Sequence, residues 1–130
     1  ASMRFIARAY KAKNDYLSAR AWLYKAIIET PFSREPYLEM AKLMYDEQNW
    51  AGVYHMVVEA QNIKQRTTYI NDAWCWDHTL DDLGAISCYN LGMYEKSLKH
   101  AKTASTLRPS DERIKNNLKI IEDKINSLKA

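Results

Sequence analysis

The strongest constraint on the fold is an internal repeat. Three stretches of the chain, residues 14–31, 49–65 and 92–109, align with one another. Each begins at a polar or glycine turn, continues with an aromatic residue and then runs into an amphipathic helical pattern. The aromatic residues of the first two copies are 34 residues apart, and those of the last two are 44 apart. A period of this length is typical of helical-repeat proteins, in which each repeat is one supersecondary unit.

Small side chains recur at matching places in the three copies. They are Ala7, Ala41 and Ala85; Ala19, Val53 and Ser97; and Ala26, Ala60 and Ala104. Antiparallel helices approach closely where side chains are small, so the pattern predicts helix crossings at these positions. The arrangement resembles the tetratricopeptide repeat (TPR), a helix–turn–helix unit. The resemblance implies an all-α fold, a right-handed superhelical solenoid of about three helical hairpins with a C-terminal capping helix.

The repeats also give the expected boundaries. One domain is predicted over 1–130, with repeats over 1–33, 34–65 and 78–110, an insertion over 66–77 and a capping helix over 110–129. The predicted hairpin helices cover 3–13, 16–29, 34–47, 50–63, 79–91 and 95–107. Ser110 is the expected N-cap of the last helix. The chain is expected to be a fragment of a longer protein, because no start or cap precedes its first helix.

Composition excludes several classes of protein. With 47% hydrophobic and 27% charged residues and no long apolar run, the chain is neither disordered nor membrane-spanning. Three glycines and three prolines are too few for a turn-rich sandwich or barrel. The net charge is only +3 and the sequence contains no basic tract, so nucleic acid is not expected as a partner. Cys75 and Cys88 form no disulfide framework, which favours a reducing, cytoplasmic setting.

The ten residues in excess of the repeat lie in the insertion, which contains Tyr69, Trp74 and Trp76. Long loops in compact arrays are often functional, and tryptophans bury large areas. Two interpretations therefore stay open. The insertion either folds back to fill a gap in the solenoid, with Trp76 buried against the second and third repeats, or it shapes a surface for a ligand or partner.

Residues that could carry catalysis or bind metal are sparse. Cys75, Asp77 and His78 are metal-capable, but zinc needs four ligands and no second cluster supplies the rest. No catalytic residue, metal or cofactor is therefore predicted. Asp81 and Asp82 fall in a first helical turn, where the helix dipole favours negative charge.

Three further motifs resemble the C-terminal repeat region of bacterial and phage family 2 glycosyltransferases. They are Arg34-Glu35-Pro36, then Tyr69 and Trp76, then Asp111, Arg113, Asn116 and Asn117. The resemblance implies a non-catalytic accessory domain that positions the catalytic domain, its acceptor or a partner protein. The catalytic part of such enzymes carries an Asp-x-Asp metal motif, and no such motif occurs in these 130 residues. The alternative is a free-standing adaptor that binds an extended peptide.

The inner surface of a TPR array is lined by the first helix of each repeat. The resemblance places there Arg4, Arg8 and Lys11; Glu35, Glu39, Lys42 and Tyr45; and Asp82, Ile86 and Tyr89. The first three share one helix face because they are four and three residues apart. Opposite Lys42, they form either an electropositive docking site for an acidic segment or phosphate-bearing acceptor, or a solvated charged face. The expected partner is a protein or peptide, or else a glycan or glycoprotein acceptor.

Overall fold

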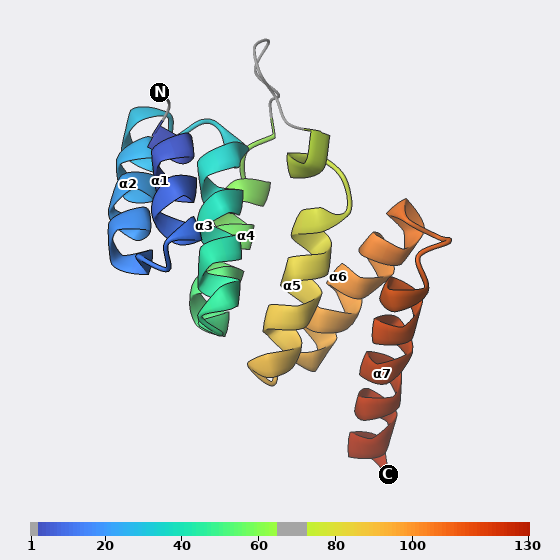
Figure 1. Cartoon of the computed structure of the whole chain (residues 1–130). Helices are drawn as coiled ribbons and strands as arrows, with labels where there is room; N and C mark the ends of the chain where they lie inside the picture. The colour runs from blue at the N-terminus through green and yellow to red at the C-terminus, as the bar shows by residue number, and fades with distance from the viewer. Residues whose placement is uncertain (1–2, 65–72) are drawn as a thin grey trace. The chain divides into compact units, whose positions relative to one another are not determined.

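The computed structural model describes residues 3–64 and 73–130, apart from the side chain of residue 74, and this part of the chain is all-α (Figure 1). Its elements are α1 (Met3–Ala12), α2 (Tyr16–Glu29), α3 (Arg34–Asp46), α4 (Trp50–Gln61), the short 3-10 helix η1 (Ala73–Cys75), α5 (Thr79–Asn90), α6 (Tyr94–Leu107) and α7 (Glu112–Lys129). The seven α-helices described pack as sequential antiparallel pairs, and α7 packs on α6. Each predicted hairpin helix is confirmed to within two residues at either end.

The chain divides into two compact units, residues 1–72 and 73–130. In the N-terminal unit, the α1–α2 and α3–α4 hairpins contact each other through α3, which touches both α1 and α2. The C-terminal unit holds η1, the α5–α6 hairpin and α7. The right-handed solenoid that would join all three hairpins into one domain stays a prediction.

Each hairpin turns through the same backbone conformation. Asn14, Gln48 and Gly92 precede the second helix of their hairpins with φ angles of 61°, 56° and 77°. This left-handed conformation suits glycine and is tolerated by asparagine. In the first two turns the next residue, Asp15 or Asn49, caps the second helix through its side chain. The three left-handed residues are 34 and 44 apart, so the backbone repeats with the period that the aromatic residues predicted.

The small residues that recur in the three copies lie in the core. All nine are buried, with exposed fractions of 6% or less. Ser97 is the one polar member, and its hydroxyl donates a hydrogen bond of 2.7 Å to the carbonyl oxygen of Ala85. That bond offsets the cost of burying a hydroxyl, so a serine fits in the third repeat at the position that Ala19 occupies in the first.

The insertion predicted over 66–77 lies partly outside the described residues. Tyr69 and the side chain of Trp74 are outside them. Within residues 73–77, Cys75 is buried in η1 and Trp76 is half-buried. The packing of Trp76 against the second and third repeats stays a prediction, because Trp76 belongs to the C-terminal unit and the second repeat to the N-terminal unit.

An apolar stripe on α7 covers the last hairpin. Ile121 and Ile125 of α7 form a core cluster with Ala85 of α5 and Ala101 of α6. Leu118 packs against the same cluster. The predicted capping helix is therefore present, and it buries its apolar stripe on the hairpin that precedes it.

The N-cap of α7 is Asp111, and the prediction of Ser110 was wrong. The Asp111 carboxylate accepts a hydrogen bond of 3.2 Å from the backbone N–H of Ile114. A carboxylate also brings a full negative charge to the positive end of the helix dipole, which a serine hydroxyl does not. The hydrogen bond from Ile114 holds the pKa of Asp111 below its ordinary value of 3.8.

Candidate binding site

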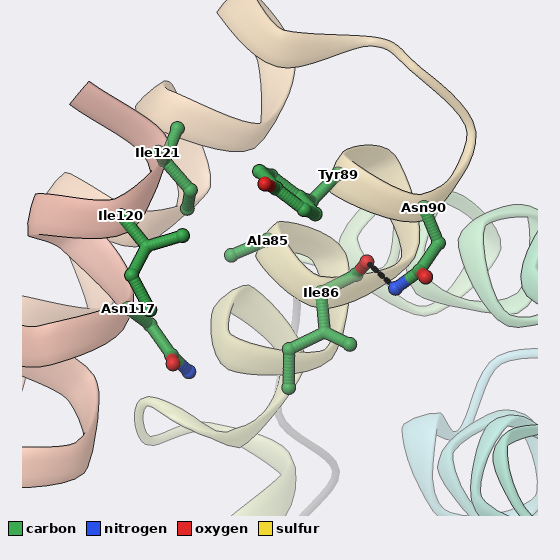
Figure 2. Close-up of a pocket in the computed structure, with 7 residues that line it drawn as sticks. All are labelled: Ala85, Ile86, Tyr89, Asn90, Asn117, Ile120 and Ile121. Carbon is green, nitrogen blue, oxygen red and sulfur yellow. Dashed lines mark hydrogen bonds between the residues drawn. The ribbon is translucent and has the colours of Figure 1, made fainter. Parts of the chain in front are cut away.

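A pocket of about 200 Å³ lies between α5 and α7 in the C-terminal unit (Figure 2). Its walls are mainly aliphatic, with polar groups at the edges. From α5 come Ala85, Ile86, Tyr89 and Asn90, and from α7 come Asn117, Ile120 and Ile121. The structure therefore places in one pocket two residues, Ile86 and Tyr89, that the sequence assigned to the inner surface.

The helical period explains why these side chains face one another. Positions 82, 86 and 89 of α5 are four and three residues apart, and so are positions 113, 117 and 120 of α7. Residues with this spacing share one face of a helix. One turn before the pocket on both helices, Arg113 pairs with Asp82 through two hydrogen bonds of 2.7 and 3.2 Å.

Polar groups stand at both edges of the pocket. The Asn90 amide nitrogen donates a hydrogen bond of 2.8 Å to the carbonyl oxygen of Ile86, which orients the side chain (Figure 2). Asn117 is half-buried on the opposite helix. The Tyr89 ring packs edge-on against Tyr94, with ring centroids 5.4 Å apart. Both amides therefore lie next to the aliphatic walls, and the aromatic ring is fixed by its neighbour.

The corresponding face of the N-terminal unit is closed by ion pairs. Arg8 pairs with Glu39 of α3, with Nε 3.0 Å from Oε1, and Arg4 Nη1 lies 4.0 Å from the same oxygen. Lys11 Nζ lies 2.9 Å from Asp46 Oδ2. The three cations predicted to form a basic end of the groove thus face carboxylates, which offset their charge.

Three other groove positions differ in their surroundings. Lys42 is exposed, and Tyr45 is 37% exposed with its ring edge-on to Trp50. Glu35, which the resemblance places on the inner surface, is only 4% exposed. The first turn of α3 lies near the residues that follow α4, where Arg34 Nε donates a hydrogen bond of 2.9 Å to the carbonyl oxygen of Ile63.

The residues at the start of α5 serve local structure. Asp77 Oδ1 accepts hydrogen bonds from the backbone N–H and the hydroxyl of Thr79, at 2.9 and 2.7 Å. His78 Nδ1 lies 3.6 Å from Asp77 Oδ2. Asp81 lies 2.9 Å from the Nδ1 atom of His100 on α6. In the described part of the chain no group of three or more His, Cys, Asp or Glu side chains is arranged to hold a metal ion.

Both cysteines are buried and free of disulfides. Burial raises the pKa of the Cys88 thiol to about 11, although the nearby charge of Lys96 acts in the opposite direction. A thiol with so high a pKa stays protonated near neutral pH, and only the thiolate is a good nucleophile. Cys88 therefore acts as a small apolar residue of the core.

Sequence reasoning missed two of the seven residues that line the pocket. Asn90 and Ile120 were not singled out. Ile120 stands directly before Ile121 and outside the buried stripe of Ile114, Leu118, Ile121 and Ile125, whose members are four, three and four residues apart. This second isoleucine, directly beside Ile121, adds apolar surface to α7 outside the stripe that is buried on the hairpin. That extra isoleucine is the signal that could have located the pocket.

Comparison with known proteins identifies no family. No protein-family model matches the chain, and no curated protein matches it. Among the helices that the structure describes, none combines the length and apolar character needed to cross a membrane.

Proposed function

We propose that this chain is a non-catalytic, TPR-like interaction module that serves as the accessory region of a family 2 glycosyltransferase. The observation that carries the first half of the proposal is the apolar pocket between α5 and α7. Helical hairpins in series present extended faces to partners, and binding sites in such proteins lie on those faces. A concave, mainly apolar pocket with a few polar groups at its edges is the usual form of a binding site.

The glycosyltransferase half of the proposal rests on resemblance in sequence. The residues that carry it have definite physical roles: Asp111 caps α7, Arg113 pairs with Asp82, and Asn117 lines the pocket. Pro36 lies in the first turn of α3, where a missing N–H costs nothing. Glycosyl transfer itself would belong to another part of a longer protein, and this module would position the catalytic domain, the acceptor or a partner protein.

A free-standing adaptor that binds an extended peptide is the second candidate. The size of the pocket favours it, because about 200 Å³ accommodates a single side chain better than a larger ligand. The two candidates share the binding surface and differ in what the rest of the protein does.

The intact protein, purified from its natural source, distinguishes them. Its mass and reading frame are expected to reveal a strand-rich domain with an Asp-x-Asp motif. A panel of UDP-, GDP- and dTDP-sugars is expected to include one that the intact protein hydrolyses and the 130-residue chain does not. An intact protein that lacks such a domain and turns over no nucleotide sugar would overturn the glycosyltransferase half and leave the adaptor.

A further inference from the structure

The volume of the α5–α7 pocket limits what it accommodates. At about 200 Å³ it is smaller than the roughly 300–1,000 Å³ typical of sites for drug-sized ligands. It is comparable to the ~150 Å³ apolar cavity that, in another protein, holds one benzene molecule. The pocket therefore has room for one compact group, the size of a large side chain.

The walls of the pocket select an apolar group. Ala85, Ile86, Ile120 and Ile121 line it, and Ile120 is 45% exposed. Burying apolar surface against these side chains is favourable. A sugar ring would instead bring several hydroxyl groups against aliphatic carbon, where they would lose water without gaining hydrogen bonds. The aliphatic walls thus favour a hydrocarbon side chain over a glycan.

The edges of the pocket fit a peptide backbone. Asn90 stands on α5 and Asn117 on α7, on the two sides of the opening (Figure 2). A primary amide both donates and accepts hydrogen bonds, as the peptide group does. An extended peptide carries a donor and an acceptor on either side of each side chain. One amide N–H of Asn90 is used by the carbonyl oxygen of Ile86. The carbonyl oxygen of Asn90 and the amide of Asn117 are placed to bind the backbone while the side chain fills the pocket.

Charge around the pocket favours an acidic neighbour. At the end nearer the start of α7, Asp82 compensates Arg113. One turn beyond Ile120, on the same face of α7, Lys124 lies 5.7 Å from the ring centroid of Tyr94 and forms no ion pair with the described carboxylates. Positive charge at that end would attract a carboxylate that follows the apolar side chain.

The repeat shows that the pocket is a local specialisation. Ala7 and Ala85 occupy matching positions, and the residues one and four places further on are Arg8 and Lys11 in α1. In α5 they are Ile86 and Tyr89. We infer that the α5–α7 pocket binds one bulky apolar side chain of an extended peptide segment, with an acidic residue beside it. This inference rests on the proposed interaction function and names its partner.

Dipeptide probes test the assignment on the 130-residue chain. N-acetyl-Leu-Glu-amide, N-acetyl-Leu-Lys-amide and N-acetyl-Gly-Glu-amide are titrated while the side-chain amide resonances of Asn90 and Asn117 are followed by NMR. We expect the Leu-Glu probe to bind with a Kd on the order of 1 mM, the range for so few atoms. The Gly-Glu probe should bind at least about tenfold more weakly, because it lacks the apolar side chain. The Leu-Lys probe should bind more weakly than Leu-Glu, by a margin that shrinks with salt.

A matched pair of variants locates the binding. Ile120→Asp places a charge in the pocket wall, and Ile28→Asp makes the same change on α2, where Ile28 is 77% exposed. Both variants alter exposed residues, and thermal melts check that both fold. Binding of Leu-Glu should be lost in Ile120→Asp and unchanged in Ile28→Asp. The inference is overturned if both variants bind the Leu-Glu probe equally, or if the resonances of Asn90 and Asn117 do not shift. It is also overturned if methyl β-D-glucoside, titrated in the same way, binds more tightly than the Leu-Glu probe. Turnover of a nucleotide sugar by the intact protein would be unaffected by that result, so the two proposals fail separately.

Discussion

Arg113 on α7 donates hydrogen bonds to both carboxylate oxygens of Asp82 on α5, with Nη2–Oδ2 at 2.7 Å and Nη1–Oδ1 at 3.2 Å. The two residues are 31 positions apart in the chain, so the pair joins the first helix of the last hairpin to the helix that caps it. Two parallel hydrogen bonds fix orientation as well as distance. The pair therefore sets how α7 faces α5 one turn from the pocket.

A double-mutant cycle measures how much the Asp82–Arg113 pair contributes to the free energy of unfolding. Asp82→Asn and Arg113→Gln, singly and together, are expected to give a coupling energy of up to about 1 kcal/mol in urea unfolding. The value is modest because the Arg113 side chain is 54% exposed to solvent. It should fall when the salt concentration is raised to about 1 M. A coupling of zero at low salt, or one that salt does not change, would contradict the ion pair.

Enlarging the buried alanines tests the repeat register. Ala41→Leu and Ala60→Leu each add a side chain at a position with 0% exposure. Overpacking of this kind is expected to lower the free energy of unfolding by about 1–3 kcal/mol. Ala21→Leu, on the exposed side of α2, is the matched control and should cost little. Normal melts for both buried variants would mean that these alanines do not lie at tight crossings.

Gly84 makes room for a side chain of the next helix. A Cβ atom at this position would lie 2.9 Å from the Cγ and Nδ1 atoms of the His100 ring, which Asp81 holds in place. Gly84→Ala should therefore destabilise the chain by about 1–3 kcal/mol, although alanine favours a helix over glycine by about 1 kcal/mol. In a His100→Ala background the same change should stabilise it, and chemical unfolding of the four variants measures both effects. The same sign in both backgrounds would exclude the ring as the cause.

The N-cap of α7 predicts a pH dependence of stability. The pKa of Asp111 in the folded chain is lowered by its hydrogen bond from Ile114, so its ionised form favours folding. This stability is fully present above the ordinary pKa of 3.8 and is lost as pH falls through the lower folded value. Asp111→Asn keeps a good N-cap but does not titrate. Between about pH 6 and pH 2, the melting temperature of the original chain should therefore fall further than that of the variant. Parallel curves for the two chains would show that this carboxylate does not contribute.

The repeat predicted the helices well because it is a local property of the sequence. Turn residues such as Asn14 and Gly92 and small residues such as Ala41 recur with one period, and each fixes a helix boundary or a crossing. The cap of α7 was misplaced by one residue, because Ser110 and Asp111 are both good N-cap residues in sequence and only the path of the backbone selects between them.

The site was harder to predict because it depends on how helices face one another. The spacing of Arg4, Arg8 and Lys11 places them on one face, but it does not reveal that Glu39 stands opposite. The packing of α7 on the α5–α6 hairpin likewise places Ile120 and Ile86 in the lining of one pocket, and no periodicity within one helix encodes that arrangement. Long-range packing therefore decided which predicted residues share a pocket.

Glycosyl transfer by the intact protein tests the proposed function most directly. The measurement compares Ile120→Asp with Ile28→Asp, using kcat/KM for the acceptor and, separately, hydrolysis of the donor nucleotide sugar in the absence of acceptor. If the module holds an acceptor or partner at the α5–α7 pocket, Ile120→Asp should lower kcat/KM for the acceptor by about tenfold or more and leave donor hydrolysis unchanged. Ile28→Asp should change neither quantity. Unchanged transfer in Ile120→Asp, or an equal loss of transfer and donor hydrolysis, would contradict a role for this module in binding.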